Sequence, residues 1–139
     1  MDGVKILFVA GFGSIVRDEM VHDIVHFYQG VLGIDFERIG DYVHTGNLEG
    51  VKHFALWPLS QAAESCFGTP HWPSDVPEPR TWIEMDVDDV AEATKELMAQ
   101  GYRCLVSNRE EPWGQTVTRL ISPDGALMGL TRTPWMRND

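Results

Sequence analysis

The second half of the chain shows the clearest pattern of hydrophobic and polar positions. Residues 81–87 alternate strictly between apolar and other side chains, which predicts a strand with one apolar face. Asp89 is a favourable N-cap residue for the helix that follows, and Glu92 three residues later completes a capping box. Gly101 ends that helix. Three extended segments follow, at residues 102–107, 116–122 and 126–133.

The first half repeats this order of elements. Residues 4–16 are rich in β-branched and aromatic side chains and predict a strand. A helical period follows, and three extended segments come after it at residues 35–39, 41–45 and 51–57. The apolar positions of that period are Val21, Ile24, Val25, Tyr28 and Val31. Each half therefore reads strand, helix and three strands. The alternative is one α+β domain without a repeat.

A proline-rich segment separates the halves. Prolines stand at positions 70, 73, 77 and 79, and proline neither donates a hydrogen bond nor lets its predecessor adopt helical angles freely. We therefore expect a linker over about 68–80. The length of 139 residues fits a single domain, with module one at about 4–60 and module two at about 81–135.

Charge and composition exclude several classes of protein. The net charge is −10 and no run of Lys or Arg occurs, which argues against nucleic acid and against anionic membrane surfaces. The longest apolar run, residues 6–12, is far shorter than a membrane helix needs. The only two cysteines, Cys66 and Cys104, fit a reduced pair better than a disulfide framework. We expect a cytoplasmic protein with neither nucleic acid nor membrane as its partner.

Several short motifs carry a family resemblance. They are Phe-Tyr-Gln-Gly-Val-Leu-Gly at 27–33, Met-Asp-Val-Asp-Asp-Val at 85–90, Glu-Pro-Trp-Gly at 111–114 and Ser-Pro-Asp-Gly at 122–125. In order and spacing the chain resembles the vicinal oxygen chelate superfamily of glyoxalases, extradiol dioxygenases and bleomycin-resistance proteins, the last branch above all. The resemblance implies an α+β fold, in which two βαβββ modules form a curved sheet around a cavity. It also implies a homodimer.

The resemblance also implies where a metal would bind. Metal-dependent members hold the ion with four side chains, and by position these fall at Gly11, His53, Trp82 and Gly129. A divalent ion needs lone-pair donors, which glycine and tryptophan side chains lack. We therefore expect no metal and no cofactor. A register shift of two residues would instead place Glu84 in a ligand position.

Five residues are the candidate ligand-binding set, and each also has a structural interpretation. On the strand at 81–87, Trp82, Glu84 and Asp86 would face the cavity. Trp82 would form a flat apolar wall, and Glu84 would bind an amine or act as a general base. Arg119 is a candidate partner for Glu84 or for an anionic ligand, and a surface salt bridge is its structural alternative. His44, with Tyr42 on its face, would lie on a strand next to that of His53. The alternatives are core packing, a loop anchor or ordinary strand hydrogen bonds. The set is Trp82, Glu84, Trp113, His53 and Trp57.

These residues predict a metal-free protein that binds a small molecule. The ligand would be hydrophobic, aromatic or cationic, and the resemblance to bleomycin-resistance proteins implies that it is sequestered. One alternative is an enzyme of the same superfamily, either a metal-dependent lyase or dioxygenase using His53 or a metal-free isomerase using Glu84. Another is a domain whose pocket is filled by side chains and which only dimerises.

Overall fold

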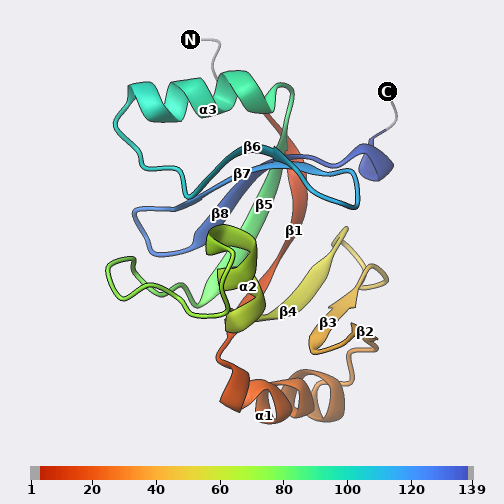
Figure 1. Cartoon of the computed structure of the whole chain (residues 1–139). Helices are drawn as coiled ribbons and strands as arrows, with labels where there is room; N and C mark the ends of the chain where they lie inside the picture. Colours follow the sequence, from red (N-terminus) through yellow and green to blue (C-terminus); the bar gives the residue numbers. More distant parts are fainter. Residues whose placement is uncertain (1–3, 138–139) are drawn as a thin grey trace.

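The computed structural model describes residues 4–137, in which eight strands form one curved sheet (Figure 1). The strands are β1 (Ile6–Val16), β2 (Glu37–Ile39), β3 (Tyr42–Thr45), β4 (Phe54–Pro58), β5 (Thr81–Val87), β6 (Val106–Glu110), β7 (Thr116–Ile121) and β8 (Leu127–Arg132). The α-helices are α1 (Val21–Val25), α2 (Leu59–Phe67) and α3 (Val90–Ala99). Short 3-10 turns lie at η1 (Asp18–Met20) and η3 (Pro134–Met136), and a π-helical turn, η2 (His26–Val31), extends α1.

The order of strands across the sheet is β2-β3-β4-β1-β5-β8-β7-β6. β1 is parallel to β4 and β5 is parallel to β8, so both halves of the chain order their strands in the same way. The halves meet where β1 and β5 pair antiparallel. The expected α+β fold of two βαβββ modules in a curved sheet is therefore confirmed.

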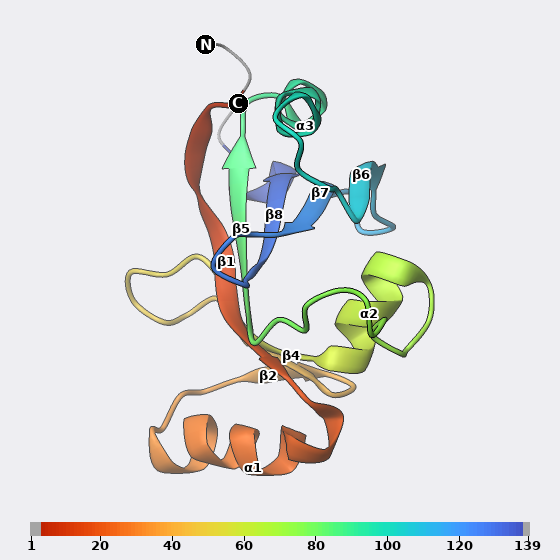
Figure 2. The ribbon, with the colours of Figure 1, turned by 90° about the vertical axis from the view of Figure 1, so that its left-hand side faces the viewer.

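The helices of the two modules pack on one face of the sheet. Val25 of α1 packs with residues of β3 and β4, and Val90 and Ala93 of α3 pack with Val87 and Leu130. Asp89 caps α3 as expected, since its side chain accepts a hydrogen bond from the Glu92 backbone at 3.1 Å. Turned by 90°, the molecule shows α1 and α3 at opposite ends of the curved sheet (Figure 2).

Helix α2 lies on the other face, and the sequence analysis did not anticipate it. Its buried residues Ala62 and Cys66 share a cluster with Ala55 of β4 and with Trp82 and Leu127 of module two. Figure 2 shows α2 beside the sheet, between the levels of α1 and α3. The helix therefore fills part of the hollow formed by the curved sheet. None of the helices within residues 4–137 is long and apolar enough to cross a membrane.

The strand expected at 102–107 lies four residues later, at 106–110. Gly101, at φ +89°, ends α3, and the Tyr102 backbone donates back to Leu97 at 3.1 Å, so the chain is still leaving the helix there. The new strand is irregular because Asn108 adopts a positive φ of 48° and its N–H donates to the Thr118 hydroxyl at 2.8 Å. Residues 102–105 therefore form a loop, and the strand begins only at Val106.

Candidate functional site

A cavity of about 650 Å³ lies between the two modules. Strands of both modules line it, together with the loop after β6 and the segment after β8. All five candidate residues line this cavity: His53, Trp57, Trp82, Glu84 and Trp113. The structure thus brings them together, whereas their binding of a ligand stays a prediction.

Tryptophans form much of the cavity wall. Trp82 is only 4% exposed, and its indole N–H donates to the Ala55 carbonyl at 3.1 Å. Trp57 stands edge-on to Trp82, with ring centroids 6.0 Å apart. Trp113 is 56% exposed and donates from its indole nitrogen to Gln115 at 3.0 Å. The wall is therefore rigid near β5 and open to solvent at the loop.

A buried ion pair forms the floor on the module-two side. Arg119 Nη2 lies 2.9 Å from Glu84 Oε2, and Gln115 Nε2 donates to Glu84 Oε1 at 3.0 Å. Arg119 therefore pairs with Glu84, one of the two partners considered for it, and the pair is buried and not a surface salt bridge. The Arg119 guanidinium also lies over the Trp57 ring, 5.1 Å from its centroid. Both oxygens of the carboxylate are thus held by side chains of the protein.

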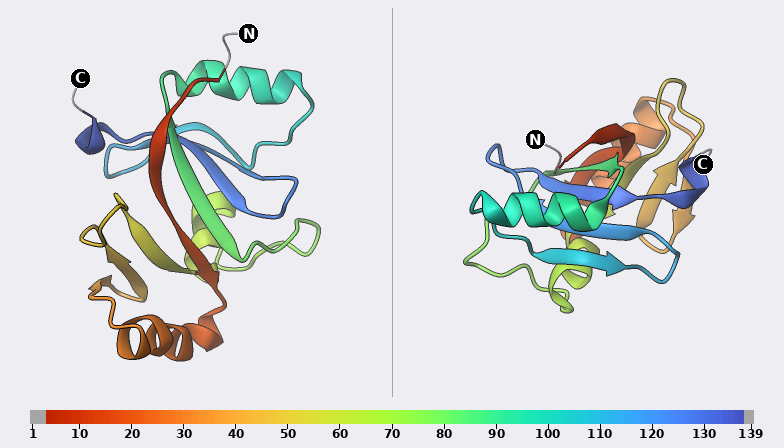
Figure 3. Two further views of the ribbon diagram at one scale, coloured as in Figure 1. Left: turned by 180° about the vertical axis from the view of Figure 1, so that it is seen from behind. Right: turned by 90° about the horizontal axis from the view of Figure 1, so that it is seen from above.

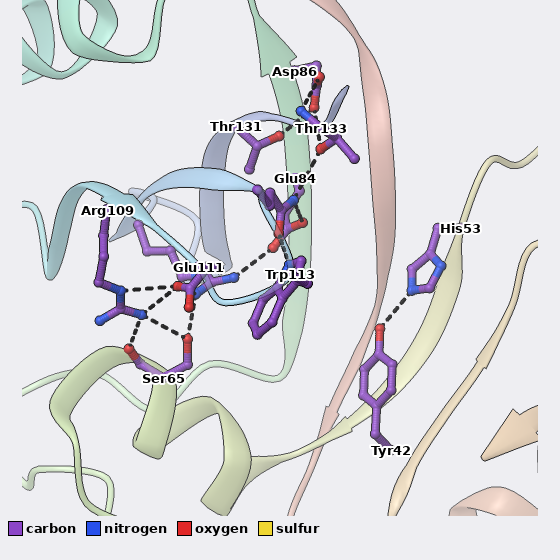
Figure 4. A network of polar contacts seen from close by, with 12 residues as sticks. Tyr42, His53, Ser65, Glu84, Asp86, Arg109, Glu111, Trp113, Thr131 and Thr133 are labelled. Carbon is purple, nitrogen blue, oxygen red and sulfur yellow. Dashed lines mark hydrogen bonds and ion pairs between the residues drawn. The ribbon is translucent and has the colours of Figure 1, made fainter. Parts of the chain in front are cut away.

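Arg119 links this floor to α2. Its Nη1 donates to the Ser65 hydroxyl at 2.5 Å and lies 3.7 Å from Glu111 Oε1. Arg109 donates to the same Glu111 oxygen and to the Ser65 carbonyl, both at 2.6 Å, as Figure 4 shows. The charges of two carboxylates and two guanidinium groups therefore cancel within one network, and α2 is fixed against the site.

Three flat rings form the opposite wall, on β3 and at the start of β4. Tyr42 Oη and His53 Nε2 lie 2.7 Å apart and share a hydrogen bond, drawn on the right of Figure 4. His44 stacks against both rings. Burial is the main cause that lowers the pKa of His53, with a further contribution from His44, and burial raises the pKa of Tyr42. Burial therefore favours the uncharged forms of His53 and Tyr42 in this wall.

Asp86 corrects one expectation, because it does not line the cavity. It is fully buried and accepts hydrogen bonds from the Thr131 hydroxyl at 2.6 Å and from the Thr133 backbone at 2.8 Å. Arg137 Nε donates to it at 2.9 Å. These bonds hold the segment after β8, whose Trp135 joins the cavity lining. Asp86 therefore serves the site by anchoring one of its walls.

Sequence reasoning missed several lining residues, among them Gln115, Trp135 and Met136. Trp135 and Met136 lie beyond the last strand, in η3, and the bonds from Thr133 and Arg137 to Asp86 hold their segment in place. No local pattern marks such a contact. A usable signal for Gln115 was its place one residue before β7, next to the Glu-Pro-Trp-Gly motif.

Of the four positions at which the family resemblance places metal ligands, His53 and Trp82 line this cavity, and Gly11 and Gly129 lie next to lining residues. A side chain added at Gly11 would meet Trp82 at 3.0 Å and His53 at 3.2 Å, and one at Gly129 would meet Glu84 at 2.9 Å. Neither glycine supplies a donor, and Trp82 offers only an indole. Within residues 4–137, no three His, Cys, Asp or Glu side chains are grouped so that they could hold an ion. The residues present do not fit a bound metal.

Comparisons with known proteins agree with this geometry. The model of the Glyoxalase/Bleomycin resistance protein/Dioxygenase superfamily matches residues 9–130. Among curated proteins, none matches the sequence. A superfamily member from Vibrio splendidus 12B01 has a similar structure, with 15% identity, a TM-score of 0.56, and coverage of 94% of this chain and 99% of that one.

A variant of methylmalonyl-CoA epimerase from Streptomyces coelicolor, in complex with 2-nitronate-propionyl-CoA, is also similar. Its identity is 18% and its TM-score 0.56, with 94% of this chain and 99% of that chain covered. At such identities the likeness establishes the fold alone. The family model spans most of the chain, and the chain therefore belongs to the Glyoxalase/Bleomycin resistance protein/Dioxygenase superfamily.

Proposed function

We propose that the protein binds a neutral, planar organic molecule in the cavity between its modules and sequesters it without a metal. One observation carries this proposal: the wall is aromatic, and its charged side chains, Glu84 and Arg119, are already bonded to partners within the protein. On such a surface, stacking and apolar contacts stabilise a bound ligand more than a charge on the ligand does. A volume of about 650 Å³ is in the range of small-molecule sites.

The paired floor argues for a neutral ligand over a cationic one. Glu84 is the carboxylate that lines the cavity, and its oxygens are held by Arg119 and Gln115. A ligand cation would have to displace Arg119, which is 3% exposed and would then be left buried without its partner. The same contacts argue against Glu84 as a free general base.

An enzyme of the same superfamily is the second candidate, and one observation favours it. Tyr42 and His53 form a hydrogen-bonded pair in the cavity wall, and such pairs can move protons. This reading requires turnover of a bound compound, lost on His53→Gln while binding is kept. Binding with no chemical change to the ligand supports sequestration.

The binding proposal can be tested with N-phenyl-1-naphthylamine, a neutral aromatic probe whose fluorescence rises in apolar surroundings. We expect saturable binding at one site per chain. Trp113→Ala should weaken it about tenfold, because an exposed stacking surface at the mouth is lost. Tyr102→Ala is the matched control, since Tyr102 is an exposed aromatic residue that does not line the cavity. No saturable binding by the unaltered protein would refute the proposal.

We further propose that two copies associate as a homodimer. The central strand β1 exposes an unusually large apolar surface. Its exposed side chains are Ile6, Leu7 and Val9, at 46%, 42% and 43%. Seen from behind, β1 and β5 cross the middle of the sheet with no helix over them (Figure 3). Light scattering should give twice the chain mass, and Val9→Lys should give the monomer. A monomeric parent protein would refute this.

We also propose a cytoplasmic location, which the two cysteines support. Cys66 and Cys104 are free, and burial raises the pKa of each thiol, so neither is an activated thiolate. Unreactive free thiols suit a reducing compartment. Fractionation of cells that express the protein would test this, and recovery outside the cytoplasm would refute it.

A further inference from the structure

One imidazole in the cavity has two ring nitrogens that no neighbour uses. His44 stacks on Tyr42 and His53, with ring centroids 5.3 Å and 5.4 Å away, but within residues 4–137 its side chain makes no hydrogen bond. The indoles of Trp57 and Trp135 also line the cavity without a hydrogen bond, but an indole can only donate. His44 is therefore the lining side chain whose free nitrogen atoms can both accept and donate.

The stacking fixes how this imidazole is presented. The planes of His44 and each neighbouring ring differ by only 25°, so Tyr42 and His53 lie against the ring faces of His44. The nitrogen atoms stand at the ring edge and stay available. In the neighbouring His53, by contrast, one of the two ring nitrogens, Nε2, is already engaged by the Tyr42 hydroxyl at 2.7 Å.

We propose that His44 determines ligand specificity and selects planar aromatic compounds that carry a ring hydroxyl, the chemical class of phenols and naphthols. The inference rests on the proposed binding function and adds the group that the ligand must carry. A neutral imidazole has one donor and one acceptor nitrogen, and a hydroxyl can pair with either. A methyl group of the same size can pair with neither.

The opposite wall does not offer an equal place for that hydroxyl. Gln115 and Arg119 both donate to Glu84 there, and Gln115 also donates to Thr133 at 3.1 Å. A ligand hydroxyl on that side competes with bonds already made. At His44 it adds a bond and breaks none, so the selectivity resides on β3.

The test compares 2-naphthol with 2-methylnaphthalene, which differ by hydroxyl against methyl at equal size. Calorimetry on the full chain should give about fivefold tighter binding of 2-naphthol, the effect of one hydrogen bond in a site that water also reaches. In His44→Phe, which keeps the stacked ring, this ratio should fall to about one. His22→Phe is the matched control, because His22 is exposed on α1, and it should keep the ratio.

The outcomes separate this inference from the function on which it rests. If the unaltered protein binds both probes equally, or if His44→Phe keeps the preference, the role of His44 is refuted and the binding function stands. If the unaltered protein binds neither probe, the binding function itself fails. Should His44→Phe not fold, as judged by circular dichroism, the same ratio measured on His44→Leu decides the question.

Discussion

The buried pair of Asp86 and Arg137 allows a sharp test of what holds the C-terminal wall of the cavity. Replacing Asp86 by Asn keeps the size of the side chain and removes its charge. One oxygen, which accepts from the Thr133 backbone at 2.8 Å and from Arg137 at 2.9 Å, then becomes an amide in half of the orientations. The Arg137 guanidinium is left without a counter-charge in either orientation.

The burial of both partners sets the magnitude. Asp86 is fully buried and the Arg137 side chain is 6% exposed, so water cannot replace the lost interaction. Removing one partner from such a pair costs about 3–5 kcal/mol. Whole-domain stabilities are about 5–15 kcal/mol, so Asp86→Asn should remove a large share of the total. Replacing both partners, as Asp86→Asn with Arg137→Met, should cost less than the sum of the single changes.

Urea unfolding followed by circular dichroism measures these free energies. Glu92→Gln is the control, because Glu92 pairs with Lys95 at 3.4 Å while both side chains are more than half exposed. That change should cost less than about 1 kcal/mol. If Asp86→Asn costs no more free energy of unfolding than Glu92→Gln, the reasoning that the buried pair fixes the C-terminal segment is refuted. Weaker N-phenyl-1-naphthylamine binding by Asp86→Asn should accompany the loss of stability.

Three further predictions concern metal, pH and packing. After equilibration with Ni, Zn, Mn and Fe(II), elemental mass spectrometry should find no ion at one per chain, and a stoichiometric ion lost on His53→Ala would contradict the donor argument. Because the folded pKa of His53 lies below its ordinary 6.5, the unfolded chain binds the proton more tightly and stability should fall as pH drops below about 6.5. His53→Gln should flatten that slope in urea titrations at several pH values, and His22→Gln should not. Gly13→Ala should lower the free energy of unfolding by about 3 kcal/mol, because the new Cβ would lie 1.8 Å from the Ala55 carbonyl oxygen. Gly46→Ala is the control, since its Cβ would lie 3.5 Å from the nearest atom, the Lys52 carbonyl oxygen. Equal stability of the two variants in urea unfolding would contradict this.

Local patterns were enough to predict most of the sheet. The alternation over 81–87 predicted both the strand β5 and which of its side chains lie on each face. Met85 and Val87 pack toward α3, and Trp82 lines the cavity. Asp89 marked the start of α3 because capping is decided within four residues. Signals of this kind depend on neighbours in sequence, and the family resemblance then implied that the two modules form one curved sheet around a cavity.

The features that the sequence did not reveal depend on contacts between distant residues or on a weak hydrophobic pattern. Helix α2 has a helical stripe that includes Ala62, Ala63 and Cys66, but small side chains stand out little beside the proline-rich segment that follows. Asp86 lies on the strand face that should meet the cavity, yet Arg137, fifty-one residues away, draws it into a buried pair. No local pattern predicts such a partner, and Trp135 reaches the cavity wall for the same reason.

The two walls of the cavity come from different modules, and this links occupancy to the stability of the whole chain. Tyr42, His44 and His53 belong to the first module, whereas Trp82 and Glu84 belong to the second. A compound held between them acts as a reversible cross-link over the β1–β5 seam. At a hundred times its Kd, such a compound adds about 2.7 kcal/mol to the free energy of unfolding. The melting temperature thus reports on occupancy, and a thermal-shift screen can search for the natural ligand with no assay of activity.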